Sequence, residues 1–412
     1  MIVLYFWFKD VEMRRKQIGV ILLWLFCVSV ACRSESEGAA GKAGDSGGSA
    51  VPAAATPAPP VKPALPIDPV FDETANFLAG RPCETPILKA FQETEEYRSF
   101  MAALDQSWAE LEGNRFLPMR TWAGAEIAEA GAATKTLFYP FGGPDGLTAE
   151  VLFPKAGHYV LLGLEFVGRM PEFKAGEEKR ISAYFQNLQV SLKDFLNKSY
   201  FITKNMNEAM SGDKVDGVLP LLCFFLKRTG NVISSIRRLD VLENGEASAS
   251  PYPGERTKFR RPYGIRIDFF AEGTDVLRTM SYFSCDLVDD VFRKDTPFHA
   301  YLAGLPFETT FVKSASYLMH YKEFSNIRSL VLEKSRFILE DDTGIPFRYF
   351  PPAVWDVRLY GEYIKPVSDF SGVEQLDLKT AYADPARVKP LPFHLGYHWG
   401  TNKDSILYIV KK

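Results

Sequence analysis

The chain has 412 residues, with 48 Lys and Arg against 51 Asp and Glu and a formal net charge of −3. This even balance, without a basic stripe, disfavours nucleic-acid binding. Apolar residues make up 46% and aromatic residues 14% of the chain, which is ample material for a buried core. At most one disulfide is available among Cys83, Cys223 and Cys285, so the core must supply the stability.

The N-terminal region has the three parts of an export signal. The cations Arg14, Arg15 and Lys16 precede an apolar run over 18–28, and small residues then lead to Cys32. A run of about eleven apolar residues is shorter than the roughly 20 that a membrane-spanning helix needs. The order resembles a bacterial lipoprotein signal. A plain cleaved secretion signal and an uncleaved anchor are the alternatives.

The resemblance to a lipoprotein signal implies a location. Residues 1–32 would be the signal, with Met13 favoured as its start because Asp10 and Glu12 place negative charge where a signal needs positive charge. Cys32 would carry the acyl chains, including palmitate, and two or three chains together give stable membrane anchoring. We therefore expect a lipid-anchored protein of the cell membrane or outer membrane, facing the periplasm or the exterior.

A tether is predicted to follow the signal. Residues 33–66 are mostly Ser, Gly, Ala and Pro, with too little apolar surface to offset the entropy of the chain. Random-coil scaling gives this segment a reach of roughly 30 Å. The sequence thus predicts a globular part, 67–412, held near a membrane surface.

The first half of the globular part contains a βαβ pattern. In chain order we predict helices over 72–79 and 94–112, a loop over 120–134, a strand over 135–139, a helix over 145–153 and a strand over 159–166. Thr94 is the expected N-cap of the second helix. A strand, a helix and a strand within about thirty residues are typical of a Rossmann-like start.

A helical insertion, about 177–228, interrupts the strands. Within it we predict helices over 181–196, 200–210 and 215–227. Strands are expected over 232–242, 264–271, 277–287, 309–317, 336–340, 355–363, 392–399 and 405–410, with a hairpin at Gly273 and a helix over 325–334. The pattern predicts an α/β domain with a mixed sheet and antiparallel C-terminal strands.

A glycine-rich turn is the nearest approach to a ligand motif. Gly142, Gly143 and Asp145 lie between the first predicted strand and its helix, and Glu165 ends the next strand. Such a turn lets backbone approach a ligand, and the acid can accept a hydrogen bond from a ribose hydroxyl. Residues 135–165 resemble the start of class I S-adenosylmethionine-dependent methyltransferases, although the Gly-x-Gly spacing is missing. A structural turn in which Asp145 caps the helix is the competing interpretation.

Other candidate ligand-binding residues are Lys313, His320, Asp341 and Asp342. The triplet Asp342-Thr343-Gly344 is that of aspartic proteases, but the second triplet is missing, and we interpret it as a turn. Lys313 and His320 are expected on a partly exposed strand and its end. The catalytic residues and the cofactor stay unknown at this level.

No metal site is predicted. His394 and His398 are four residues apart, but Gly396 and the alternation of Leu395 and Tyr397 indicate a strand. The two rings would then lie about 13 Å apart, too far to share one metal ion.

The segments 138–143, 159–168 and 313–318 resemble those of a group of bacterial exported proteins without known function. Two hypotheses follow. The chain is a membrane-tethered binding or structural lipoprotein of the envelope, or an envelope enzyme whose site lies at the carboxyl ends of the strands near Gly142 and Glu165. A deep pocket that brings Asp145, Glu165 and a distant polar cluster together would favour the enzyme, and a flat surface there would favour the binding or structural protein.

Overall fold

The computed structural model describes residues 65–198, 215–252, 262–398 and 403–412. These all belong to one of the two units into which the chain divides, Lys62–Lys412. The signal, nearly all of the tether and the helix predicted over 200–210 lie outside the described residues.

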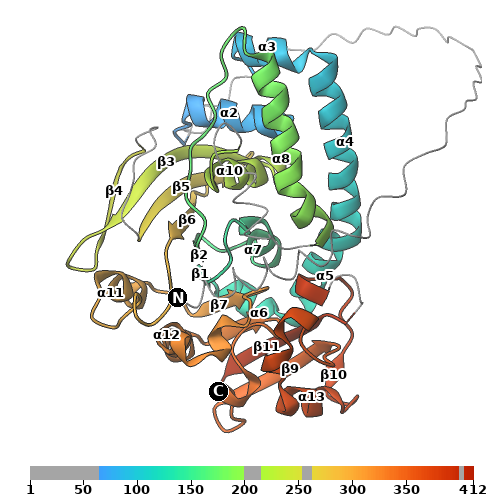
Figure 1. Ribbon diagram of the computed structural model, residues 1–412, viewed down its shortest axis with the longest axis vertical. Helices are drawn as coiled ribbons and strands as arrows, with labels where there is room; N and C mark the ends of the chain where they lie inside the picture. The colour runs from blue at the N-terminus through green and yellow to red at the C-terminus, as the bar shows by residue number, and fades with distance from the viewer. Residues whose placement is uncertain (1–64, 199–214, 253–261, 399–402) are drawn as a thin grey trace, which may run out of the picture. The chain divides into compact units, whose positions relative to one another are not determined.

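One mixed sheet of eleven strands organises this unit (Figure 1). The strand order is β10-β9-β11-β8-β7-β1-β2-β6-β5-β3-β4. The strands are β1 (Thr136–Tyr139), β2 (His158–Gly163), β3 (Asn231–Val241), β4 (Ala247–Pro251), β5 (Tyr263–Ala271), β6 (Arg278–Ser284), β7 (Thr309–Val312), β8 (Phe337–Glu340), β9 (Trp355–Gly361), β10 (Val388–Lys389) and β11 (Ser405–Lys411). The predicted α/β fold with a mixed sheet is therefore confirmed.

The centre of the sheet is parallel, and its flanks are antiparallel apart from the outermost pair, in which β10 runs parallel to β9. Strands β8, β7, β1, β2 and β6 run in one direction. On one side β5 pairs antiparallel to β6, as the predicted hairpin requires, and on the other β11 runs antiparallel between β8 and β9. The five parallel strands follow the 3-2-1-4-5 order of doubly wound nucleotide-binding folds.

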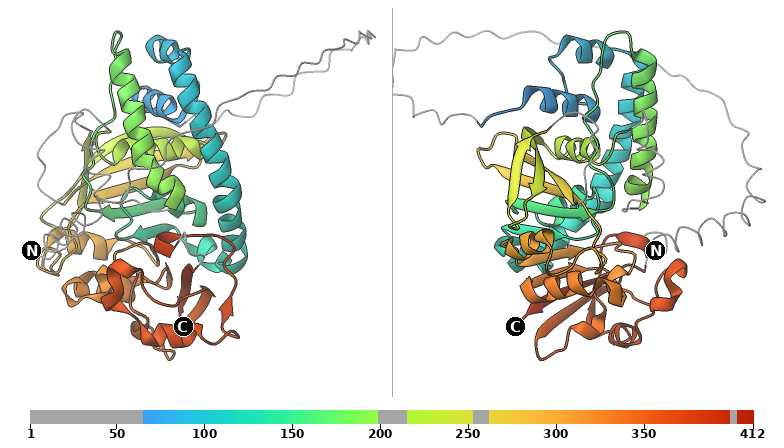
Figure 2. Two further views of the ribbon diagram at one scale, coloured as in Figure 1. Left: turned by 45° about the vertical axis from the view of Figure 1, so that its right-hand side comes forward. Right: turned by 60° about the vertical axis from the view of Figure 1, so that its left-hand side comes forward.

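Helices cover both faces of the sheet (Figure 2). They are α2 (Pro69–Ala79), α3 (Pro86–Gln92), α4 (Glu95–Leu111), α5 (Leu117–Glu126), α6 (Ala128–Ala133), α7 (Gly146–Leu152), α8 (Glu178–Lys198), α10 (Leu219–Arg228), α11 (Pro297–Gly304), α12 (Ser325–Lys334) and α13 (Leu376–Tyr382). Thr94 caps α4 as predicted, since its side chain accepts a hydrogen bond from the amide of Tyr97.

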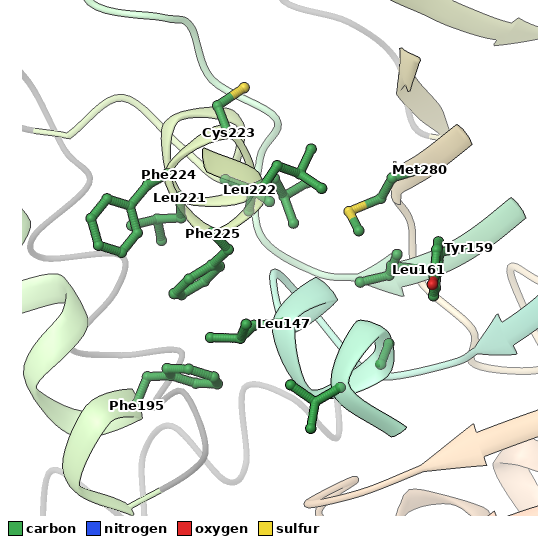
Figure 3. Packing of buried hydrophobic residues seen from close by; sticks show 14 of the residues in the cluster. Leu147, Tyr159, Leu161, Phe195, Leu221, Leu222, Cys223, Phe224, Phe225 and Met280 are labelled. Atoms are coloured by element: carbon green, nitrogen blue, oxygen red, sulfur yellow. The ribbon is translucent and has the colours of Figure 1, made fainter. Parts of the chain in front are cut away.

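Successive residues of the central strands enter two different cores. In β1, Leu137 belongs to the cluster under α7 and α10, while Phe138 belongs to the cluster under α11 and α12. This alternation follows from the two-residue period of a strand. Figure 3 shows part of the first core, where Leu147 of α7, Phe225 of α10 and Phe195 of α8 gather on one side of the sheet.

The loop predicted over 120–134 is wrong. A π-helix, Glu112–Phe116, continues α4 directly into α5, and α6 follows. Pro118 explains why the helix widens to a π turn at this point. Proline has no N–H to donate into a regular α-helical ladder, and the wider π turn accommodates the missing hydrogen bond. Short apolar Ala-rich stretches with two glycines, Gly124 and Gly131, concealed α5 and α6 from a periodicity argument.

Two predicted strands are also wrong in part. Strand β7 ends at Val312, so residues 313–317 form a turn rather than strand. The strand predicted over 392–399 is absent from its described part, 392–398, where the only regular element is the 3-10 turn η6 (Gly396–His398). The short β10 lies before this range and was not predicted. Helices α3, α11 and α13 and strand β4 were not predicted. Cys83, Cys223 and Cys285 are all buried, and none of the three is in a disulfide.

Candidate functional site

The carboxyl ends of β1 and β7 mark the point where the strand order reverses. From β1 the chain moves through α7 to β2 on one side, and from β7 it moves through α12 to β8 on the other. Loops diverge at such a switch point, and doubly wound sheets bind ligands there. Most of the sequence-predicted site residues lie in the turns at this edge.

The glycine-rich turn after β1 is built under backbone constraint. Phe141 adopts a φ of 62° and Gly143 a φ of 53°. Gly142 has no room for a side chain, because a methyl group there would lie 2.7 Å from the ring of Tyr139. Asp145 then caps α7 by accepting a hydrogen bond from the amide of Thr148 at 3.1 Å, as predicted. Tight packing thus accounts for the glycines and the acid.

Glu165 lies against this turn. A methyl group at Gly143 would be 3.2 Å from Oε2 of Glu165, and the amide of Gly143 donates to the carbonyl of Leu162 at 3.1 Å. Tyr282 of β6 donates to the backbone carbonyl of Glu165 at 2.7 Å. The predicted pairing of the glycine turn with an acid at the end of β2 is therefore present, and the acid is buried.

A buried ion pair joins the turns after β1 and β7. Nζ of Lys313 lies 2.6 Å from Oδ2 of Asp145, and both side chains are at most 3% exposed. Tyr139 donates a hydrogen bond to the same carboxylate oxygen at 3.0 Å. Burial lowers the pKa of Lys313, and the Asp145 carboxylate opposes that shift. The prediction of a partly exposed strand surface at Lys313 is wrong, because the side chain is enclosed.

Arg115 adds a second cation that the sequence did not suggest. The π-helix Glu112–Phe116 carries it, and its Nη1 donates to the carbonyl of Phe195 at 3.3 Å. Burial lowers the pKa of Arg115 to about 10, while Asp145 and Asp404 oppose the shift. π-Helical turns occur often at functional sites. The only signal in the sequence was Pro118, which interrupts the helix just beyond Arg115.

The turn after β7 is held in an unfavourable conformation. Ser314, Ser316 and Tyr317 have φ values of 52°, 51° and 54°, in the left-handed region. Such residues cost roughly 1–3 kcal/mol each and persist where the surroundings determine them. The amide of Ser314 donates to Oδ2 of Asp341 at 2.9 Å, and the amide of Ala315 donates to Oγ1 of Thr343 at 2.8 Å.

The acidic turn after β8 supplies those acceptors. Oδ1 of Asp341 accepts from the amide of Thr343 at 3.0 Å and from its hydroxyl. Burial raises the pKa of Asp341 to about 7, with the neighbouring Asp342 carboxylate acting in the same direction. As predicted, residues 342–344 form a turn.

Asp342 points to a different set of partners. Tyr317 donates to its Oδ2 at 2.5 Å and Ser405 donates to its Oδ1 at 3.4 Å. Nε2 of His398 lies 3.8 Å from Oδ2 of Asp342. Burial lowers the pKa of His398, but the surrounding carboxylates, led by Asp342, together outweigh burial and leave that pKa raised.

His320 and Glu340 border the acidic turn. His320 ends a 3-10 turn, packs edge-on to Tyr317 at 5.2 Å, and has a buried Nε2 without a partner among the described residues. Burial lowers its pKa to about 4. Glu340 accepts from the amide of Ile345 at 2.9 Å, and burial raises its pKa well above the usual value.

Residues 394–398 cover the turns after β7 and β8. Gly396 approaches Asp341 so closely that a methyl group would lie 2.7 Å from its Oδ2. Tyr397 donates to the carbonyl of Ser314 at 2.8 Å, and its hydroxyl lies 3.0 Å from Oγ of Ser316. Nδ1 of His394 lies 2.6 Å from Oδ2 of Asp404. The prediction that His394 and His398 lie on one face of a strand is wrong, because residues 394–398 form no strand and each histidine lies beside its own aspartate.

The structure therefore gathers Asp145, Lys313, Asp341 and Asp342 from three turns into one buried cluster. His320 lies at its Asp342 side, and Glu165 lies on the other side of the glycine turn with Gly143. Residues that sequence reasoning missed are Arg115, Tyr139, Ser314, Tyr317, Tyr397, His398 and Asp404.

No family model, no curated protein and no solved structure matches the chain. Within the described residues no group of three or more His, Cys, Asp or Glu side chains is placed to hold a metal ion. Nor does any helix in the described ranges have the length and apolar character to cross a membrane.

Proposed function

We propose that the chain is a lipid-anchored protein of the bacterial envelope whose α/β domain binds a small polar ligand at the switch point of its sheet. The anchor rests on the signal pattern that ends at Cys32, and the tether on the composition of 33–66. The ligand site rests on the turns after β1 and β7.

One observation carries the ligand site. Among the described residues, the non-glycine residues with positive φ are Phe141, Ser314, Ser316 and Tyr317, and all four lie in the two turns that flank the switch point. Strained backbone costs stability and concentrates at binding and catalytic sites. The buried pair of Lys313 and Asp145 supports the same reading, since a buried ion pair is a poor source of stability.

The ligand chemistry follows from what surrounds the switch point. Two of the three aspartates in the buried cluster have a basic neighbour, because Lys313 pairs with Asp145 and His398 lies 3.8 Å from Asp342. Burial raises the pKa of the third, Asp341, to about 7, so its carboxyl group keeps part of its proton near neutral pH. This favours an uncharged or zwitterionic ligand with hydroxyl groups, for which Glu165 beside Gly143 offers an acceptor. The resemblance of residues 135–165 to class I S-adenosylmethionine-dependent methyltransferases, together with the doubly wound strand order, places that cofactor among the ligands to test.

Ligand-induced stabilisation tests the site. A panel of nucleosides, S-adenosylmethionine, S-adenosylhomocysteine and simple sugars would be screened by thermal shift on wild type, Glu165→Gln and the exposed control Glu243→Gln. A binder at 100 times its Kd should add about 2.7 kcal/mol of stability to wild type and the control. We expect Glu165→Gln to lose that gain while keeping its own melting temperature.

Two outcomes would contradict the ligand site. If no compound in the panel stabilises wild type, the proposed ligand class is wrong. If Glu165→Gln responds like wild type to every binder, Glu165 lies outside the site. Gly143→Val would be a poor substitute, since the positive φ and the contact with Glu165 would strain the fold itself.

The lipid anchor has its own test. Cys32→Ala should leave an uncleaved precursor that does not incorporate a fatty-acid probe, because acylation requires the thiol of that cysteine. Cys27→Ala, within the apolar run, is the matched control and should label like wild type. Undiminished labelling of Cys32→Ala would show that the chain is not a lipoprotein of this kind.

An enzyme is the second candidate, and Asp341 favours it. Its carboxyl group is buried beside Asp342 with a pKa of about 7, the range that suits general acid–base catalysis near neutral pH. Lys313, with a lowered pKa, lies in the turn that Asp341 holds through the amide of Ser314. Chemical conversion of any ligand that the panel identifies, lost in Asp341→Asn, would distinguish an enzyme from a binding protein.

A further inference from the structure

Three residues of the segment 394–398, namely Gly396, Tyr397 and His398, contact the turns after β7 and β8. The hydroxyl of Tyr397 is hydrogen-bonded to Ser314 and Ser316 in the turn after β7. The backbone of Gly396 lies on the carboxylate of Asp341, and His398 lies beside Asp342. These contacts cross from a segment near the end of the chain to turns far away in sequence. Asp341 and Asp342 are 4% and 3% exposed under this cover.

The same segment is attached to the rest of the fold without strand pairing, through the side chain of Leu395 in the core under α7 and α10 and through the contacts of residues 396–398. It belongs to no strand, and its only regular element is the short turn η6. Gly396 adopts a φ of 77°, which glycine tolerates and which lets the backbone lie flat on the Asp341 carboxylate. Tyr397 stacks on Phe370 at 5.9 Å, and that ring comes from another 3-10 segment, Ser368–Val373. A segment held mainly by side-chain contacts opens at a lower free energy than a paired strand.

We infer that residues 394–398 form a latch that closes the switch-point site, and that the latch must open for the ligand to enter. This inference rests on the proposed function for the identity of the site, and it concerns how access to that site is regulated. Closure is local: the side chain of Tyr397 and the backbone of Gly396 cover the strained turn 314–317 and the acidic turn 341–344. Opening frees both turns without separating any strands of the sheet.

The latch and the strained turn 314–317 are energetically coupled, because the same hydrogen bonds hold both. Ser314, Ser316 and Tyr317 keep their left-handed conformation because Asp341, Asp342 and Tyr397 bond to that turn. Removing Tyr397 from the turn therefore loosens the strained residues as well as the latch. The closed state lowers the apparent affinity for ligand, because only the open fraction of molecules is competent to bind.

Two variants open the latch by different routes. Tyr397→Phe removes the hydroxyl that bonds Ser314 and Ser316 but keeps the ring on Phe370. Its control is Tyr349→Phe, whose ring keeps its contact with the guanidinium of Arg328 at 4.6 Å. Gly396→Ala pushes the backbone away from Asp341. Its control is Gly273→Ala, which has a similar φ of 75° but open space around the new methyl group.

Amide hydrogen exchange on the purified full-length protein, without any ligand, measures the opening. In both test variants we expect the amides of 394–398 and 313–317 to exchange about fivefold faster or more, with α12 and β1 unchanged, and in both controls no change. Unchanged exchange in 394–398 would overturn the latch. So would an equal rise throughout the domain, because 394–398 would then be part of the cooperative core.

The ligand screen separates the latch from the proposed function. If no compound stabilises wild type while 394–398 still opens independently, the proposed ligand is wrong and the latch stands. If S-adenosylmethionine or another compound of the panel binds wild type, Tyr397→Phe should bind it more tightly. Weaker binding by Tyr397→Phe would mean that Tyr397 contacts the ligand directly, which would overturn the latch.

Discussion

Replacing Lys313 with methionine is expected to lower the free energy of unfolding by about 3–5 kcal/mol. The substitution keeps an apolar stem of similar length but leaves the Asp145 carboxylate buried without its cation. Tyr139 and the cap of α7 still bond to Asp145, so the loss comes from the unpaired charge. Urea unfolding monitored by circular dichroism would measure it.

A double variant and a surface control make this result specific. Lys313→Met combined with Asp145→Asn should be more stable than Lys313→Met alone, because no buried charge is left unpaired. Lys379→Met removes an exposed pair with Glu374, which lie 2.9 Å apart, and should change stability by at most about 0.5 kcal/mol. If Lys313→Met lost no more stability than Lys379→Met, Lys313 and Asp145 would not form a charged, enclosed pair.

The stability of the domain should fall as pH rises from about 6.5 to 8.5. Burial raises the pKa of Asp341 to about 7, so the folded state retains a proton that the unfolded carboxyl group gives up near pH 4. That contribution is complete below the unfolded pKa, is lost progressively between about pH 4 and 7, and loses its last part, about 1 kcal/mol, above pH 6.5. The raised pKa of His398 acts in the same direction.

Two other histidines confine this effect to the alkaline side. Burial lowers the pKa of His158 and of His320 to about 4, so each adds stability as pH rises from about 4 to 6.5 and nothing beyond. Below pH 6.5 these contributions oppose that of Asp341. Urea midpoints at pH 6.5, 7.5 and 8.5 should therefore decline, and decline less in Asp341→Asn than in the exposed control Asp290→Asn. A flat profile in wild type would contradict the raised pKa of Asp341.

Periodicity predicted most strands and most longer helices, because their apolar residues mark one or two faces. Strands β3, β5, β9 and β11 and helices α4, α8 and α12 appear close to their predicted bounds. The prediction of the βαβ unit had a further basis. Asp145 is a good N-cap after a glycine-rich turn, and it marks the boundary between β1 and α7.

The site was predictable only in part. Gly143 and Glu165 could be paired from the sequence, since both follow adjacent parallel strands. The turn over 313–317 could not be predicted from the sequence. Ser and Tyr carry no signal for positive φ, and the alternating pattern that begins at Thr309 continues through these residues as it would in a strand. What ends that strand is a contact with Asp341, distant in the chain.

The strand predicted around Gly396 was wrong for a similar reason. Leu395 and Tyr397 alternate with smaller or polar neighbours, which indicates a strand. The competing cause is again a long-range contact, since Gly396 must pass over the carboxylate of Asp341. Arg115 was missed because a π turn has no amphipathic period of its own. Contacts between distant turns, rather than local propensity, thus decide where the buried charges meet.

The outer strands of the sheet bear on how such a protein would behave when crowded. At one edge β4 has the sequence Ala-Ser-Ala-Ser-Pro, and Pro251 has no amide to offer a neighbour. At the other edge β10 is only two residues long, and one of them is Lys389. Short, polar and proline-bearing edges resist edge-to-edge joining of sheets. Molecules held in a single plane by the proposed lipid anchor would meet far more often than in solution, and these edges would then keep neighbouring copies from assembling into continuous β-structure along the membrane surface.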